Sequence, residues 1–370
     1  TNHISGREFI PDGAEWLPTA NVRFLDTAET TLAESLRDAG YRTAFFGKWH
    51  LAGVPGRQGL GDPRYYPEQH GFDVNFGGCA HGGPPTFFDP YGIHNLANRE
   101  KGEYLPDRLV DEVIGYLGGS AGAQDGPDHR PFFVTLWNYT VHWPMEAPEQ
   151  LVQKYRSRLG PGIKDARYAA MIEAMDRALG RLFRFLDQKK LSSNTLVIFT
   201  SDNGAYGGVA DNRPLRAAKG YLYEGGIRVP LMIRWPQVTE PGQQLDSPVI
   251  TMDLHATILD AVGLPPAEPT DGRSLRGLLR GKPFADRPLY FHYPNYAWHR
   301  DNRLGGAIRD GDYKLIEWFD DQSVELYNLR TDIGERRNLA TANPQLARQL
   351  QAKLTLWRKN VGAIMPKHVE

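Results

Sequence analysis

The sequence of 370 residues lacks several features that would reveal its class at once. It has a single cysteine, Cys79, so it cannot form an internal disulfide bond. Its formal net charge of −1 provides no overall attraction to nucleic acid or to an acidic membrane surface. No apolar run approaches the roughly 20 residues that a membrane-spanning helix needs. We therefore expect no nucleic-acid partner and no membrane span, and any bound anion must be held by local charge.

Apolar runs and amphipathic stretches alternate along most of the chain. The predicted elements are helix 27–40, strand 41–47, strand 131–138, helix 165–187, strand 195–200, strand 229–235 and helix 251–263. We expect Asp26 or Thr27 to cap the first helix and Gly40 to end it, and the strand at 131–138 to be buried on both faces. The alternation predicts an α/β fold with a large, mainly parallel or mixed sheet and helices on both of its faces.

The pattern changes near residue 285. Short apolar runs with turn signals between them predict a small antiparallel sheet, and one helix follows at 344–360. We therefore expect an α/β domain over residues 1–285 and a small C-terminal α+β domain over residues 286–370. The segment 53–105 is rich in glycine, proline and aromatic residues, and we expect it to be irregular and to carry function.

Polar side chains follow the predicted strands at the points where they end. Lys48 and His50 follow the first strand in GKWHLAG, and His142 follows the second in NYTVHWP. Asp202 and Asn203 follow the third in SDNG. Because ligands bind at the carboxyl ends of the strands in an open parallel sheet, we expect these residues to lie together.

Each motif also has an ordinary structural interpretation. A lone histidine after a strand is usually a hydrogen-bonded structural residue, Asp-Asn-Gly usually forms a turn, and a lysine in a glycine-containing loop, such as Lys219, is usually solvated. Their occurrence at one predicted sheet edge favours a shared site. Asp and Asn oxygens suit Ca²⁺ or Mg²⁺, lysines hold sulfate or phosphate, and histidines transfer protons. This combination indicates sulfuryl or phosphoryl transfer.

Four stretches together resemble the type I sulfatases of the alkaline phosphatase superfamily: GYRTAFFGKWHLAG, NYTVHWP, FTSDNG and KGYLYEGGIRVP. The later stretches GAIRDGDYKLIEW and ELYNL resemble the small C-terminal domain of that family. The resemblance covers essentially the whole chain. It implies hydrolysis of sulfate esters, with a sulfated small molecule or glycan as substrate and Ca²⁺, in preference to Mg²⁺, as the metal. A periplasmic or secreted location is also expected from the family.

The resemblance implies a metal site and a sulfate site. Asp202 and Asn203 correspond to metal ligands, and Lys48 and Lys219 correspond to sulfate-binding residues. Ca²⁺ prefers about six to eight oxygen ligands, whereas Asp202 and Asn203 supply at most about four. The family completes the shell with an acidic pair from its first strand, and this pair is absent from the sequence.

The resemblance also implies roles for the two histidines. His142 corresponds to a sulfate-contacting residue that protonates the leaving alcohol. His50 corresponds to the residue that orients a hydrated aldehyde nucleophile and helps to expel sulfate from it. We expect Lys48 and His50 to flank one sulfate group, with Trp49 between them turned into the packing.

The nucleophile of the family has no counterpart in the sequence. It is a formylglycine, made by a formylglycine-generating enzyme from Cys or Ser in a C/S-x-P/A-x-R motif. Cys79 lies in GGCAHGG, which has neither the proline nor the arginine, and GVPGR at 53–57 has glycine at the nucleophile position. The chain opens at Thr1 without a signal-like segment. We therefore expect it to begin just downstream of the nucleophile helix, to be N-terminally incomplete and to be inactive alone.

Three functions remain open. The first is a sulfatase, the second is a phosphodiesterase or phosphonate monoester hydrolase of the same superfamily, and the third is a non-catalytic relative that binds sulfated glycans. The two histidines argue against the third function, because a binding module needs no proton transfer. The segments 53–105 and 291–300 are rich in aromatic, His and Asn residues, which favours a carbohydrate sulfate over a small aryl sulfate.

Overall fold

The computed structural model describes residues 16–17, 22–54, 59–119, 129–266, 270–296 and 302–368. Thr1, most of the GVPGR stretch and the end of the 291–300 segment lie outside these ranges. The strands are β1 (Trp16–Leu17), β2 (Arg42–Gly47), β3 (Val74–Phe76), β4 (Phe132–Trp137), β5 (Val197–Thr200), β6 (Leu231–Arg234), β7 (Leu289–Tyr293), β8 (Gly305–Asp310), β9 (Tyr313–Trp318), β10 (Val324–Asn328) and β11 (Lys367–His368). The α-helices are α1 (Leu32–Asp38), α2 (Leu105–Leu117), α3 (Glu149–Arg156), α4 (Ala166–Gln188), α5 (Glu224–Ile227), α6 (Met252–Ala261), α7 (Arg276–Leu279) and α8 (Pro344–Asn360). None of the helices in these ranges is long and apolar enough to cross a membrane.

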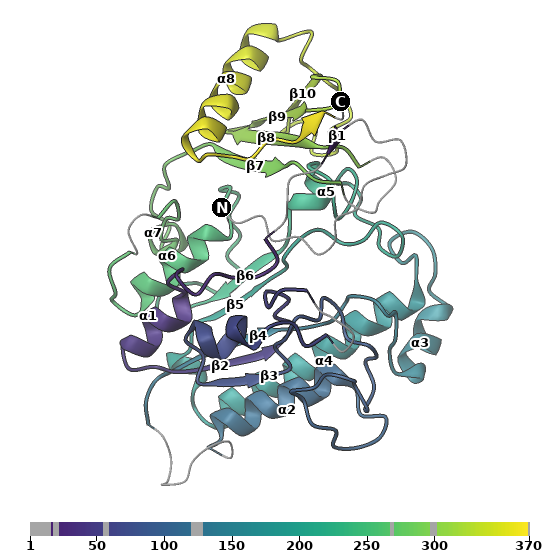
Figure 1. Cartoon of the computed structure of the whole chain (residues 1–370), viewed down its shortest axis with the longest axis vertical. Coiled ribbons are helices and arrows are strands. Elements are labelled where there is room, and N and C mark those ends of the chain that lie inside the picture. Colours follow the sequence, from purple (N-terminus) through teal and green to yellow (C-terminus); the bar gives the residue numbers. More distant parts are fainter. Residues whose placement is uncertain are drawn as a thin grey trace.

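A parallel sheet in the order β3-β2-β4 lies in the larger, lower part of the molecule (Figure 1). Successive side chains of β2 point to opposite faces of this sheet. Phe46 packs with Val113 and Tyr116 of α2 on one face. Phe45 packs on the other face with Trp49, which is 5% exposed and so is turned into the packing as expected. β2 is therefore buried on both faces.

β5 and β6 form a separate antiparallel pair, so β6 departs from the parallel direction that the strand–helix alternation predicts. The fold is accordingly mixed α/β. β4 differs from expectation too, because its residues are mostly half-buried and Trp137 is 48% exposed. A cleft of about 2180 Å³ is lined by both β4 and β5, and no described strand pairs with β4 on the edge opposite β2. The prediction that β4 is buried on both faces is therefore wrong.

The C-terminal sheet is antiparallel in the order β10-β9-β8-β7. One face packs against α8, with Leu315 of β9 beside Leu354. The opposite face packs against the segment that precedes α5, with Ile316 beside Leu222 and Tyr223. Figure 1 shows this sheet with α8 at the upper end of the molecule and α5 between the sheet and the larger part. The predicted small antiparallel sheet with one helix is confirmed.

The first helix begins later than the sequence predicts. Thr31 is its N-cap, because the Thr31 hydroxyl oxygen accepts a hydrogen bond from the Glu34 amide at 3.1 Å. In return, the Glu34 carboxylate accepts a hydrogen bond from the Thr31 amide at 2.7 Å. This reciprocal capping box satisfies two helix-end amides, whereas the predicted caps Asp26 and Thr27 lie outside the helix. The end at Gly40, which has a φ of 88°, is as predicted.

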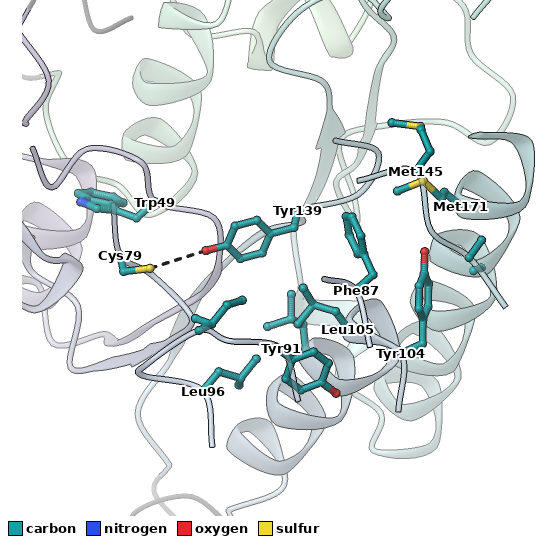
Figure 2. Packing of buried hydrophobic residues seen from close by; sticks show 14 of the residues in the cluster. Trp49, Cys79, Phe87, Tyr91, Leu96, Tyr104, Leu105, Tyr139, Met145 and Met171 are labelled. Carbon is teal, nitrogen blue, oxygen red and sulfur yellow. Dashed lines mark hydrogen bonds between the residues drawn. The ribbon is translucent and has the colours of Figure 1, made fainter. Parts of the chain in front are cut away.

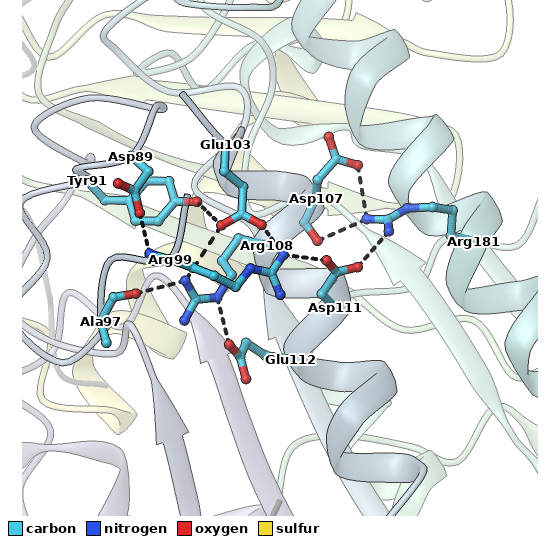
Figure 3. A network of polar contacts seen from close by, with 10 residues as sticks. All are labelled: Asp89, Tyr91, Ala97, Arg99, Glu103, Asp107, Arg108, Asp111, Glu112 and Arg181. Carbon is cyan, nitrogen blue, oxygen red and sulfur yellow. Dashed lines mark hydrogen bonds and ion pairs between the residues drawn. The ribbon is translucent and has the colours of Figure 1, made fainter. Parts of the chain in front are cut away.

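Helices α2 and α3 are not among the predicted elements, and α2 fastens the irregular 53–105 segment in place. Arg108 of α2 donates a hydrogen bond to the Ala97 carbonyl oxygen at 2.8 Å. On the other side of α2, Arg181 of α4 contacts the carboxylates of Asp107 and Asp111 at 3.0 and 2.6 Å. Figure 3 shows these contacts as one network of charged side chains. The irregular segment is thus tied to the helices beside the parallel sheet.

The largest cluster of buried apolar side chains joins the parallel sheet to the irregular segment (Figure 2). Cys79 lies inside this cluster, fully buried, with its sulfur 4.0 Å from the Tyr139 hydroxyl. Burial raises the pKa of the Cys79 thiol above its ordinary value, which disfavours the reactive thiolate. The position of Cys79 agrees with its exclusion as a nucleophile on sequence grounds.

Candidate active site

The turn after β2 brings Lys48 and His50 to the edge of the parallel sheet. Gly47 ends the strand with a φ of 100°, and a Cβ atom there would lie 2.0 Å from the carbonyl oxygen of Trp137, so only glycine fits. The Lys48 amide donates to the same oxygen at 2.7 Å, and the His50 amide donates to the Cys79 carbonyl at 2.8 Å. His50 adopts a left-handed φ of 59°, a conformation that is uncommon for non-glycine residues and clusters at functional sites.

His142 follows β4 at the same edge. Its backbone amide donates to the Tyr139 carbonyl at 3.0 Å, and its ring Nδ1 lies 3.2 Å from the Trp143 carbonyl oxygen. A hydrogen bond at this point requires a proton on Nδ1, which leaves Nε2 of the neutral ring as an acceptor. His142 is half-buried and lines the cleft between β4 and β5.

Asp202 and Asn203 follow β5, and a backbone contact joins this turn to the loop that carries Lys219. The Lys219 amide donates to the Ala205 carbonyl oxygen at 3.1 Å. All the predicted site residues line the same cleft: Lys48, His50, His142, Asp202, Asn203 and Lys219. Asp202 is exposed, whereas the others are half-buried. The structure therefore brings together every residue that the strand ends predict.

The charged groups of the cleft act on one another. Burial lowers the pKa of Lys48, and the charge of the Lys219 ammonium also lowers it. The nearby Asp202 carboxylate raises the pKa and partly offsets these two effects. Such coupling requires the three charges to be close neighbours. Two ammonium groups beside one carboxylate leave an excess of positive charge, which suits a compact anion with several oxygen atoms.

Both histidines are neutral at pH 7. Burial lowers the pKa of His50 and of His142 to about 4, and the positive charge of Lys48 adds to the effect on each ring. The charge of Lys219 also lowers the pKa of both rings. An anion bound between the lysines would offset this positive potential and raise the pKa of both rings. The arrangement can therefore link anion binding to proton uptake.

Asp202 and Asn203 offer the hard oxygen donors that Ca²⁺ prefers. They supply at most about four of the six to eight oxygens of a calcium shell. Within the described part of the chain, no three His, Cys, Asp or Glu side chains gather into a group that could hold a metal ion. The two residues fit part of a calcium shell by their chemistry, and further ligands are needed to complete it.

Three residues near the site were not identified from the sequence. Arg23 lines the cleft, and its charge contributes to the low pKa of His50. Gly82 and Gly83 lie against the two rings: a Cβ atom on Gly82 would be 2.6 Å from His50 Cε1, and one on Gly83 would be 2.6 Å from His142 Nδ1. Two consecutive glycines in an irregular segment indicate that the backbone there lies close to another group. This pattern was the sequence signal that could have identified Gly82 and Gly83.

Two family models match the chain. The model described as Sulfatase matches residues 10–264, and the model described as N-sulphoglucosamine sulphohydrolase, C-terminal, matches residues 217–360. A sulfatase of Formosa agariphila is 34% identical over 283 residues, which cover 69% of this chain and 50% of the relative. The N-acetylgalactosamine-6-sulfatase of Canis lupus familiaris is 29% identical over 88% of this chain and 61% of its own length. The chain thus spans between half and about three fifths of these two relatives.

Solved structures share the fold of this chain. The structure of Ps i-CgsB in complex with k-i-k-neocarrahexaose has a TM-score of 0.76 at 26% identity, over 93% of this chain and 78% of that one. The phosphonate monoester hydrolase of Agrobacterium radiobacter shares the fold, with a TM-score of 0.66 at 21% identity over 91% of this chain and 81% of that one. Since the Sulfatase model alone covers more than half of the residues, the chain belongs to the sulfatase family, the type I sulfatases of the alkaline phosphatase superfamily.

Proposed function

We propose that this chain forms the anion-binding and proton-transfer part of a sulfatase that releases sulfate from a sulfated carbohydrate. The observation that supports this best is the meeting of Lys48, Lys219, His50 and His142 at one cleft. A sulfate ester places negative charge on a compact set of oxygens, which two ammonium groups can bind. Histidines beside that anion can move protons during cleavage of the ester.

Each side chain has a distinct role in this proposal. Lys48 and Lys219 bind the sulfate oxygens. His142 donates a proton to the leaving alcohol oxygen after the bound anion has raised its pKa from about 4. His50 approaches from the turn after β2, orients the nucleophile and moves a proton during the release of sulfate.

Two further components complete the proposed site. Asp202 and Asn203 would hold Ca²⁺, which, when bound, neutralises charge on the sulfate oxygens. A formylglycine, made by a formylglycine-generating enzyme, would supply the attacking oxygen. The printed sequence contains no C/S-x-P/A-x-R motif, so a segment outside it would carry this residue. Cys79 is no alternative, because it is buried and burial raises the pKa of its thiol.

We assign the substrate to the carbohydrate sulfates. One relative is named N-acetylgalactosamine-6-sulfatase, and Ps i-CgsB was solved with k-i-k-neocarrahexaose. Most aromatic side chains of the 53–105 segment are buried in the core, so the support for this substrate class comes from the comparisons. We also propose a boundary between the catalytic domain and the small domain at residues 285 and 286, which is supported by the separate apolar cluster between the C-terminal sheet and α8.

The decisive experiment compares this chain with one extended upstream to include the nucleophile motif and produced with a formylglycine-generating enzyme. We expect the extended chain to release sulfate from sulfated sugars and the 370-residue chain to release none. Lys219→Ala and His142→Ala should abolish release by the extended chain. Comparable turnover by the shorter chain would locate the nucleophile within it and contradict the proposal.

The substrate class is tested on the same extended chain. Contacts to the sugar stabilise the transition state only when the sugar is present, so kcat/KM should be higher for sulfated saccharides than for an aryl sulfate. Turnover of the aryl ester alone would remove the carbohydrate assignment. Faster cleavage of phosphodiesters or phosphonate esters would favour the alternative activity in the same superfamily.

A further inference from the structure

Three charged side chains meet in the buried space between α5 and the C-terminal sheet. Lys314 Nζ, on β9, lies 3.0 Å from Glu224 Oε1 and 2.9 Å from Glu335 Oε1. The Glu224 amide donates to Glu335 Oε2 at 2.7 Å. The side chains of Lys314, Glu224 and Glu335 are 0%, 3% and 0% exposed. The first residue of α5 is therefore held at its side chain and at its backbone by two residues from the C-terminal part of the chain.

α5 is in turn bonded to the turn that follows β5. The Gly204 amide donates to the Gly226 carbonyl oxygen at 2.9 Å. A Cβ atom on Gly204 would lie 1.9 Å from the Gly225 carbonyl oxygen, so the two backbones touch without an intervening side chain. Gly204 directly follows Asn203 in the sequence. A displacement of Glu224 would therefore reach the backbone that carries the candidate metal ligands.

A second set of contacts joins Lys219 to the same turn. We call residues 202–205 and 217–226 the site loops. The Lys219 amide donates to the Ala205 carbonyl oxygen at 3.1 Å. The Asn212 side-chain amide donates to one carbonyl oxygen in each site loop, at 3.0 and 3.2 Å. The two site loops therefore form one hydrogen-bonded unit, with the Glu224 end anchored under the C-terminal sheet.

Apolar and aromatic contacts hold the second site loop against the same sheet. Leu222 and Tyr223 pack with Ile316 and Trp318 on the face of the sheet that points away from α8. The Arg216 guanidinium lies over the Tyr223 ring, 3.8 Å from its centroid. These contacts can keep the loop and the sheet together without the ion cluster.

The ion cluster is better suited to fixing geometry than to stabilising the fold. Desolvation offsets most of the attraction in a buried ion pair, so its net contribution to stability is small. Arg228 Nη1 lies 3.8 Å from Glu224 Oε2, and this second cation balances the second carboxylate. We propose that Lys314 is a positioning residue that sets the placement of the site loops through Glu224. This inference rests on the proposed anion site, and it gives the C-terminal sheet a part in building that site.

The double variant Lys314→Met/Glu335→Gln separates positioning from stability. Lys314→Met alone leaves two buried carboxylates without their lysine and should lower the melting temperature. Adding Glu335→Gln removes one charge and keeps a side-chain oxygen for the Glu224 amide, so the melting temperature should return towards that of the wild type. Amide hydrogen exchange in the site loops should still become about tenfold faster, because the Glu224 carboxylate has lost its anchor.

Binding of inorganic sulfate to the full chain, measured by calorimetry, provides the second readout. The double variant should bind sulfate about tenfold more weakly, which corresponds to about 1.4 kcal/mol. Arg358→Met/Glu317→Gln is the matched control, because this ion pair lies on the opposite face of the same sheet, with side chains 10% and 15% exposed. The control should change neither the exchange of the site loops nor the affinity for sulfate.

The outcomes distinguish this inference from the proposed function. A folded double variant with wild-type exchange and wild-type sulfate affinity would overturn the positioning role of Lys314. A double variant that fails to fold would also overturn it, because the cluster would then be an element of stability. If the wild-type chain binds no sulfate, the proposed anion site is wrong, whereas the exchange of the site loops still decides the role of Lys314.

Discussion

The backbone of Gly83 lies so close to the His142 ring that a Cβ atom would come within 2.6 Å of Nδ1. Gly83→Ala should therefore displace the ring and weaken sulfate binding several-fold, and the shift should appear in histidine NMR spectra. Gly115→Ala on α2 is the control, because nothing lies within 4 Å of a Cβ atom there. It should leave binding unchanged and raise the free energy of unfolding by about 0.5–1 kcal/mol. Equal sulfate affinity in both variants would contradict the contact.

Stability should depend on pH through the two site histidines. The pKa of His50 and of His142 is about 4 in the folded state, because of burial and of the Lys48 charge. The unfolded value is about 6.5, so between the two values the unfolded chain binds more protons and stability falls as the pH falls. We expect the melting temperature to decrease from about pH 6.5 to about pH 4, and less so in His50→Gln and His142→Gln. A wild-type dependence on pH in both variants would show that the two rings are not its source.

Sulfate should raise the pKa of both histidines. Its negative charge would offset the positive potential of Lys48 and Lys219, which lowers the pKa of His50 and of His142 in the free protein. NMR titration in sulfate and in chloride at equal ionic strength measures the difference. Lys219→Ala should reduce it. Identical titration curves in the two salts would show that the cleft does not bind sulfate beside these rings.

Ca²⁺ binding should depend on the turn after β5. Because two residues supply only part of a calcium shell, we expect this chain to bind Ca²⁺ weakly, with a dissociation constant on the order of 10⁻³ M. Asp202→Asn and Asn203→Ala should weaken binding further in calorimetric titrations. Asp286→Asn removes an exposed carboxylate away from the cleft and should have no effect. If all of these proteins bind Ca²⁺ equally, Asp202 and Asn203 are not ligands.

The capping box of α1 is open to a direct test. Thr31→Ala should lower the free energy of unfolding by about 1 kcal/mol, because the Glu34 amide loses its acceptor. Thr27→Ala changes the exposed residue that the sequence also offers as a cap, and should be neutral. Urea unfolding of both variants measures the difference. A larger loss in Thr27→Ala would show that Thr27, and not Thr31, caps the helix.

The placement of the candidate site residues could be predicted because it depends on strand ends. Short apolar runs such as β2 and β5 are recognisable from local sequence, and the residues just after them are carried to the edge of their sheets. The placement of Lys48 and Asp202 in one cleft follows from that rule. The C-terminal sheet was predictable for a similar reason, since turn signals separate its strands.

Features that depend on contacts between distant segments could not be predicted. Thr27 and Thr31 are both suitable N-cap residues in their local sequence. Thr31 caps the helix because it forms reciprocal hydrogen bonds with Glu34. The buried ion cluster of Lys314 has no local sequence signal, because its partner Glu224 is 90 residues away in the sequence. The antiparallel direction of β6 likewise could not be predicted from its amino-acid composition.

Trp137, half-exposed at the end of β4, gives the molecule an optical property that follows from its packing. Its ring stacks on the buried Trp49, with centroids 5.8 Å apart and an interplanar angle of 15°, and Trp137 also lines the cleft. Any ligand or polypeptide that fills the cleft would remove water from this indole and shift its fluorescence to shorter wavelengths. Occupancy of the cleft can therefore be followed by intrinsic emission, with Trp137→Phe identifying the signal, in the unlabelled protein.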